Sequence, residues 1–404
     1  MATDRLYRVA MSDLHTWPTN YTALKVNTAN PQHSDGGDNL VGDGSSGFGQ
    51  TKDLASGIFY SDPSIPNVRL LYRANSLEFE DFMHSTWSPE ARVQDSTIAF
   101  DPAGALIAGG GATGPVITGP AGFAQPFADA GAKGAVLKMS GTENGVNDGY
   151  RAILDVTPNQ IDLDPRYDAL ALEAAGASVD LNAGRILKLG PMEDERIVGF
   201  IFHKTREGVW VLVPANASQM QIALTGQGFI QVSFNYTGGK WEEVYAAPWA
   251  DTADNDHEFN PAMAANEQVR FCKVDGVELV NHGLVSASLD LNWNTSSEDG
   301  DAGAVSRTAI DANDATCSGS LDVWERDNVR RQLTALGLAR RNTRFDLGAG
   351  DENGNEMFFS APSIRIPPRA LGSNDNQRNR SSFPFNARMS APDVPMLILQ
   401  ELAA

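Results

Sequence analysis

Cysteine, positive charge and long apolar runs are all scarce in this sequence. Among its 404 residues only Cys272 and Cys317 are cysteines, and they form no CxxC motif and no cluster with histidine. The sequence therefore predicts neither a disulfide framework nor a structural zinc site, and two buried free thiols are expected. No run of about 18 consecutive apolar residues is present to form a membrane-spanning helix. The opening residues also lack an apolar run of signal-peptide length.

Basic residues are outnumbered by acidic ones. The 31 Lys and Arg residues stand against 51 Asp and Glu residues, which gives a net charge of −20. A surface of this charge repels a polyanion, which excludes proteins that read nucleic-acid sequence. At about 150 residues per domain the chain has room for two or three domains. Hydrophobic residues make up 42% of it, enough for a core in each.

Motifs for catalysis or ligand binding are weak. The spacing Gly109-x-Gly111-x-x-Gly114 fits a dinucleotide-binding loop, but Pro115 follows where a helix has to begin, so a turn-rich loop is the better interpretation. The acidic clusters at 251–258 and 298–301 do not have the spacing of a calcium loop. No HExxH and no GxSxG motif occurs. The sequence therefore predicts no catalytic residue, no metal and no cofactor.

Alternation of apolar and polar residues dominates the chain, as in strands with one buried face. The clearest case is 285–293, where Val285, Leu289 and Trp293 share one side with the other odd-numbered residues. Many such strands, separated by Gly, Asn and Asp turns, predict an all-β, mainly antiparallel fold. Two short helices are expected, one from Ser76 to Thr86 and one from Asp327 to Gly337.

The order of these elements recurs and predicts an internal duplication. A strand leads into a helix at 68–86 and again at 316–337, and further strands follow in the same order. Each copy also starts with a strand and a long polar loop, 27–53 and 294–315. We expect a first domain formed by 1–95 and 188–265, a small inserted β domain at 96–187, and a second domain at 266–404.

Several of these segments resemble the major tail tube proteins of long-tailed, siphovirus-type bacteriophages. The similarity lies in the runs VRLLYRANSLEFEDFMHSTW (68–87), GFIQVSFNYTG (228–238) and CSGSLDVWERDNVRRQL (317–333), in the hairpin GDENGNEMFF (350–359), and in the late strand SSFPFNA (381–387). It covers both copies, roughly 10–95 and 190–404. The inserted block is similar to small β inserts of some family members. The order and spacing of the segments carry the resemblance.

The resemblance implies two tandem tail-tube β-sandwich or barrel domains, each with one flanking short α-helix, and a small inserted β domain on the tube exterior. It implies a non-enzymatic virion protein, made in the host cytoplasm, that self-assembles into stacked rings. These rings form the tail tube, a conduit for DNA delivery through whose lumen DNA passes without specific binding. Two domains per chain imply a homotrimer ring with pseudo-sixfold symmetry, with a homohexamer as the alternative. Tape-measure, tail-terminator and distal tail proteins are the expected partners, with no cofactor and no membrane.

Contacts between subunits are expected at exposed strand edges and at interface ion pairs. Our candidates are the strands 228–237 and 381–389, with Phe234 and Phe385, and the arginines Arg330, Arg331, Arg340 and Arg341 near the second helix. Two alternatives stay open at this point. One is a virion-surface adhesin whose inserted domain binds host carbohydrate, and the other is a β-sandwich glycosidase.

Overall fold

The computed structural model of the chain describes most of its residues. These are 7–13, 22–23, 30–35, 40–41, 53–54, 59–70, 76–102, 114–142, 145–167, 170–172, 178–191, 197–204, 209–226, 228–239, 242–244, 267–298, 309–311, 313–324, 327–351, 354–368 and 380–403. Gly109, Gly111 and the acidic cluster at 251–258 lie outside this set.

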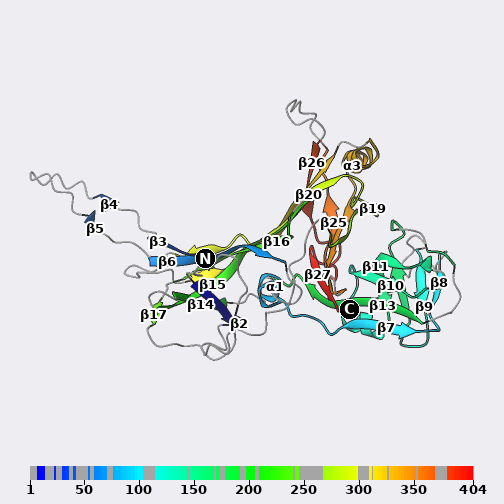
Figure 1. Ribbon diagram of the computed structural model, residues 1–404, viewed down its shortest axis with the longest axis horizontal. Coiled ribbons are helices and arrows are strands. Elements are labelled where there is room, and N and C mark those ends of the chain that lie inside the picture. The colour runs from blue at the N-terminus through cyan, green and yellow to red at the C-terminus, as the bar shows by residue number, and fades with distance from the viewer. Residues whose placement is uncertain are drawn as a thin grey trace, which may run out of the picture.

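Strands dominate, and the predicted all-β class is confirmed (Figure 1). The first half of the chain contains β1 (Tyr7–Asp13), β2 (Thr22–Ala23), β3 (Asn30–Asp35), β4 (Leu40–Val41), β5 (Asp53–Leu54), β6 (Phe59–Arg69), β14 (Ile197–Lys204), β15 (Val209–Thr225), β16 (Gln231–Gly238) and β17 (Glu242–Val244). The intervening block contains β7 (Ala91–Asp95), β8 (Ala99–Asp101), β9 (Val116–Thr118), β10 (Val136–Ser140), β11 (Gly149–Thr157), β12 (Gln160–Leu163) and β13 (Val179–Lys188). The second half contains β18 (Val269–Val274), β19 (Val277–Glu278), β20 (Leu284–Asn292), β21 (Ser296–Glu298), β22 (Ala309–Asp311), β23 (Thr316–Trp324), β24 (Thr343–Gly350), β25 (Glu356–Arg365), β26 (Arg380–Ala387) and β27 (Ile398–Leu402).

The helices of the described residues are α1 (Ser76–Phe82), α2 (Gln125–Asp129) and α3 (Asp327–Ala339). α1 and α3 begin where the sequence predicts a helix, but α1 ends before Thr86 and α3 continues past Gly337. Gly337 lies inside α3 close to the following loop, since a Cβ there would lie 3.0 Å from the carbonyl oxygen of Pro367. The helix ends at Arg340, whose φ of 52° is the left-handed conformation that commonly closes a helix.

The two halves pair their strands in the same antiparallel order. In the first half the order is β1–β14–β15–β16–β6–β3. In the second half it is β18–β24–β25–β26–β23–β20. A small hairpin lies in the corresponding connection of each half, β4–β5 before β6 and β21–β22 before β23. This recurrence supports the predicted duplication, while the predicted domain boundaries stay predictions.

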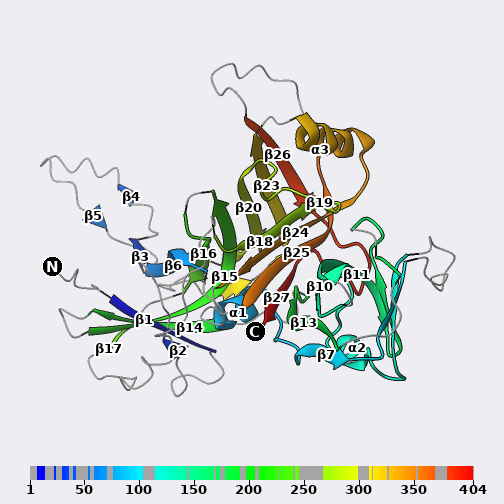
Figure 2. The same cartoon turned by 45° about the vertical axis from the view of Figure 1, so that its right-hand side comes forward.

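The halves are joined into one sheet by β15 and β20. Residues 219–225 of β15 pair with residues 286–292 of β20, Gln219 opposite Asn292 and Thr225 opposite Ser286. The seven strands β3–β6–β16–β15–β20–β23–β26 therefore form a continuous antiparallel sheet, here called the fused sheet. Figure 2 shows β20, β23 and β26 side by side in the second half, with β15 below them.

One hydrophobic core extends beneath both halves. α1 contributes to each of them, because Phe79 lies 5.6 Å from the ring of Phe234 and 6.3 Å from the ring of Phe359. The indole of Trp293 donates a hydrogen bond from Nε1 to the carbonyl oxygen of Phe82 at 2.8 Å. It also stacks on the His84 ring, with centroids 3.8 Å apart. Contacts of this kind oppose any separation of the two halves.

The intervening block has a hydrophobic cluster of its own and lies beside the second half (Figure 1). Its long strand β13 pairs with β7 over residues 179–184 and with β27 over residues 185–188. Gln400 of β27 bonds the backbone of the block three times, accepting from the Val136 amide at 2.7 Å and donating to the carbonyl oxygens of Val136 and Ala183 at 2.8 Å. The block is therefore integrated into the second half through the last strand.

Candidate functional site

The outer face of the fused sheet is mainly polar from β16 to β26. On β15, β20, β23 and β26 one side chain in two is buried, and the others face away from the core. Strand register aligns the outward residues in rows across the five central strands. One row is Gln231, Ala223, Ser288, Ser320 and Pro384, and the next is Ser233, Gln221, Asp290, Ser318 and Asn386. Small hydroxyl and amide groups therefore cover the face, and the second row contains a single charged residue.

Neighbouring strands are linked on this face by side-chain hydrogen bonds. Gln221 donates to Asp290 at 2.7 Å across the β15–β20 junction. Ser286 donates to Asp322 at 2.9 Å, and the hydroxyls of Ser288 and Ser320 are 3.0 Å apart. Partial burial raises the pKa of Asp290, while the bond from Gln221 lowers it. Cross-strand pairs of this kind stabilise a sheet and fix its register, so the face is ordered across the junction of the two halves.

The described residues of this face offer mainly hydroxyl and amide groups. Among the described residues no group of three His, Cys, Asp or Glu side chains is placed to hold a metal ion. Both cysteines are buried and free, as predicted, and burial raises the pKa of Cys317 to about 12. Within the described part of the chain, no helix has the length and apolar character to cross a membrane. Hydroxyls and amides that lie in rows suit contact with water and with a passing polar surface.

Below the face, α1 places a carboxyl group in the core. Glu78 is 2% exposed, and burial raises the pKa of its carboxyl from 4.5 to about 8, partly offset by a backbone hydrogen bond. The folded state therefore binds a proton that the unfolded state releases between these two values. The stabilising contribution of the neutral carboxyl is complete below about pH 4.5 and is lost as the pH rises through about 8.

We expect the substitution Glu78→Gln to remove the loss of stability that accompanies ionisation of Glu78 as the pH rises. Between pH 5 and pH 7 the wild-type free energy of unfolding should fall by about 2 kcal/mol relative to the variant. Urea denaturation at the two pH values measures the difference, with the exposed Glu90→Gln as the matched control. Parallel pH dependence of wild type and Glu78→Gln would contradict this assignment.

Phe234 and Phe385, predicted at subunit contacts, lie inside the chain. They are 0% and 1% exposed. The Phe234 ring packs on Phe82 at 5.3 Å and the Phe385 ring on Phe345 at 5.1 Å. Alternation marks the buried face of a strand but does not say whether the covering partner is the same chain or another. A role between subunits stays a prediction for the strands that carry the two rings.

The two predicted edge strands differ in the structure. β16, within 228–237, pairs with β15 on one side and β6 on the other, so its prediction as an edge is wrong. β26 pairs with β23 along its length but with β25 only at Asn386 and Ala387. Among the described strands, β3 pairs with β6 alone. The fused sheet therefore ends at β3 on one side and at β26 on the other.

The four predicted arginines lie on α3 and just after it. Arg330 is half-buried, whereas Arg331, Arg340 and Arg341 are exposed. Arg341 donates to Asp275 of the same chain at 2.5 Å. Arg340 takes the left-handed conformation at the end of α3. Two of the cations thus lie in the first half of α3 and two directly after its end, and their pairing across subunits stays a prediction.

Comparison with known proteins gives one match. A family model described as "Phage tail tube protein" matches residues 79–387, from α1 to the end of β26. That range is more than half of the chain and includes most of the fused sheet. None of the curated proteins compared with the chain matches it significantly.

Proposed function

This chain belongs to the phage tail tube protein family, and from that premise we propose that it self-assembles into stacked rings that form a conduit for DNA. The family is one of structural, non-enzymatic proteins of the virion tail. The observation that supports the proposal best is the fused sheet, with a polar outer face and two ends that no described strand covers fully. Unpaired edge groups of a sheet are a template for continuation by another chain.

We propose that chains join as the two halves of one chain do. Inside the chain the second part of β15 pairs with β20, which ends the strand order of the second half. By the recurrent pairing order, β25 corresponds to β15, and β3 corresponds to β20. The end of β25 of one chain would then meet β3 of the next. Such a contact is heterologous, and a ring results when the rotation closes.

Three chains would give a ring of six similar units. The repeated order β1–β14–β15–β16–β6–β3 and β18–β24–β25–β26–β23–β20 supports this homotrimer with pseudo-sixfold symmetry over the alternative homohexamer. We also propose that the tail is of the long, siphovirus type. Tape-measure, tail-terminator and distal tail proteins are the proposed partners, and the inserted block would lie on the exterior.

The polar face of the fused sheet is the proposed wall of the conduit. The two rows that run from β16 to β26 contain no basic residue to hold phosphates, and the chain has a net charge of −20. DNA in transit would therefore meet hydroxyls, amides and scattered carboxylates, which carry no positive charge and so displace no counterions from the phosphates. The carbohydrate-binding alternative is not favoured by the family match.

Thiol labelling tests the orientation of this face. Ser382→Cys places a thiol on its exposed part, and Thr157→Cys places one on the turn after β11 in the inserted block. The native cysteines give little background because both are buried. A bulky maleimide-polyethylene glycol should label both variants in dissociated protein but only Thr157→Cys in assembled tubes. Equal labelling of Ser382→Cys in tubes would reject an inward-facing sheet.

Neutralising two exposed arginines should slow assembly. Arg331→Gln with Arg340→Gln removes cations proposed to pair with acidic side chains of a neighbouring chain, and exposed pairs contribute about 0.2–1 kcal/mol each. We expect an approximately threefold to tenfold slower rise of light scattering at low salt, and a smaller difference at high salt. Thr157→Glu with Leu172→Glu changes the net charge equally and should polymerise faster than the arginine variant. Equal rates would argue against the interface pairing.

A further inference from the structure

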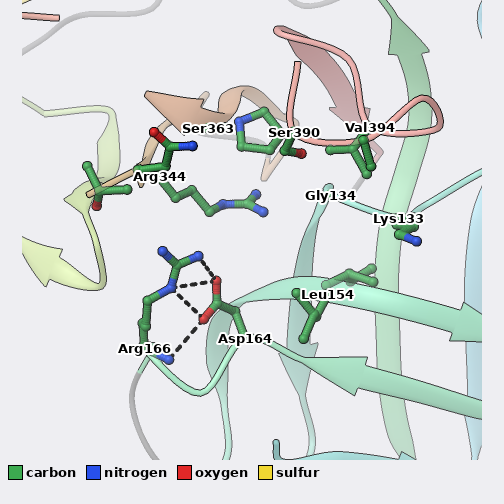
Figure 3. Close-up of a pocket in the computed structure, with 14 residues that line it drawn as sticks. Lys133, Gly134, Leu154, Asp164, Arg166, Arg344, Ser363, Ser390 and Val394 are labelled. Atoms are coloured by element: carbon green, nitrogen blue, oxygen red, sulfur yellow. Dashed lines mark hydrogen bonds and ion pairs between the residues drawn. The ribbon is translucent and has the colours of Figure 1, made fainter. Parts of the chain in front are cut away.

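A pocket of about 320 Å³ lies where the inserted block meets the second half of the chain. The block contributes Lys133, Gly134, Leu154, Asp164 and Arg166, and the second half contributes Thr343, Arg344, Ser363, Ser390 and Val394. In Figure 3 the Arg344 side chain extends into the middle of the pocket, with Arg166 and Asp164 below it and Ser390 and Val394 above. Two guanidinium groups thus face the same space.

The Arg344 guanidinium is buried but only partly compensated. Its side chain is 3% exposed, and its Nε donates to both carboxylate oxygens of Asp346 at 2.8 and 2.6 Å. Nη2 makes a long contact of 3.4 Å with the Ser360 hydroxyl. Burial lowers the pKa of Arg344 and raises the pKa of Asp346. A second acceptor beside the guanidinium would therefore be stabilising.

Arg166 is held firmly at the opposite side of the pocket. Its Nε and Nη2 donate to Asp164, at 2.9 and 2.5 Å, and its Nη1 donates to Asp275 at 3.0 Å. Lys133 at the rim pairs with Asp393 at 2.8 Å and with Asp155 at 3.5 Å. The carboxylate that lines the pocket, Asp164, is thus already occupied by Arg166. The cations are preorganised by acidic partners.

Two hydroxyls of the pocket are buried without a partner. Thr343 and Ser363 are 1% and 3% exposed, and neither Oγ1 of Thr343 nor Oγ of Ser363 has a hydrogen-bond partner among the described residues. A buried hydroxyl that makes no hydrogen bond is costly. Both atoms belong to residues that line the same cavity as Arg344. A ligand with acceptor oxygens could satisfy both hydroxyls and the guanidinium together.

We propose that this pocket binds an oxyanion, a carboxylate or a phosphate group. Guanidinium forks and hydroxyls are the donors that such groups take in proteins. The source is either an acidic side chain of a second copy of this chain or a free anion, and both present the same acceptor chemistry. The site does not depend on the proposed tube, because all its residues belong to a single chain.

Binding is tested by calorimetry on dissociated, full-length protein with inorganic phosphate and with glutarate as probes. We expect saturable binding of at least one probe, and about tenfold weaker binding by the double variant Thr343→Val, Ser363→Ala. Ser288→Ala with Ser320→Ala, which removes two hydroxyls from the sheet face, is the matched control and should bind as wild type. Arg344→Lys keeps the charge but loses the fork, and should also weaken binding. Absence of binding, or equal binding by all variants, would overturn the proposal.

Polymerisation in phosphate distinguishes the two sources. If a carboxylate of a second copy occupies the pocket, phosphate should compete and slow assembly of wild type, but not of the Thr343→Val, Ser363→Ala variant. If the ligand is a free anion, phosphate should raise the melting temperature of wild type and leave the assembly rate unchanged. A phosphate that alters neither property would count against the site. If the protein binds phosphate but does not form tubes, the proposed function is rejected and the proposal for the pocket is not.

Discussion

Gly319→Val is expected to prevent stable folding of the fused sheet. Gly319 lies in β23, between β20 and β26, on the side of the sheet that faces the core. A Cβ at this position would lie 2.3 Å from the Phe385 ring and 2.4 Å from the carbonyl oxygen of Ser288. The ring occupies the space where a side chain would stand, and the backbone of β20 cannot withdraw without breaking its ladder. We expect a loss of about 3 kcal/mol or more.

Chemical denaturation measures this effect. Ser318→Val, one residue earlier and on the polar face, introduces the same side chain and should change the free energy of unfolding by about 1 kcal/mol or less. The comparison separates the crowded core side from the open outer side of one strand. If Gly319→Val unfolds within about 1 kcal/mol of wild type, the close packing of β20, β23 and β26 is wrong.

Lysines on the polar face should convert the proposed conduit into a DNA-binding channel. Ser288→Lys with Ser320→Lys adds two cations at the centre of the fused sheet in every chain of every ring. Stacked rings would then present lines of positive charge, and each neutralised phosphate adds to the affinity through counterion release. We expect the variant tubes to retain short duplex DNA at low salt and to release it steeply as salt rises. Wild-type tubes should retain little.

Nuclease protection shows where the DNA is held. DNA retained by Ser288→Lys, Ser320→Lys tubes should resist digestion, because it lies inside. Thr157→Lys with Leu172→Lys adds the same charge to exposed positions of the inserted block, and its bound DNA should be digested. Digestible DNA on the Ser288→Lys, Ser320→Lys tubes would place the polar face on the outside.

Local pattern was sufficient to predict the elements. The alternation at 285–293 corresponds to β20, and strands expected in the inserted block correspond to β10 to β13. Helix-capping residues and the spacing of apolar residues predicted the positions of the helices α1 and α3 to within a few residues. Such features depend on neighbours in the sequence, and they can therefore be read without tertiary contacts.

The pairing of strands that are distant in the sequence could not be predicted from the local residue pattern. The junction of β15 with β20, the internal position of β16 and the burial of Phe234 all depend on which strand lies beside which. The pocket around Arg344 combines segments from 133 to 394 that meet only in the fold. Gly337 was predicted to end a helix because glycine often follows one, whereas it lies inside α3, where Pro367 leaves little room for a side chain. Only the order of elements, which recurs in the two halves, carried information about the assembly.

An electron-microscopy reconstruction of assembled tubes, with the mass per ring, is the most direct test of the account. It predicts three chains per ring, six similar sheet units in a closed circle, and the side chains of Ser288 and Gln221 turned toward the lumen. The junction between chains should match that between β15 and β20. A ring of six chains, or a lumen lined by another surface of the molecule, would contradict the account.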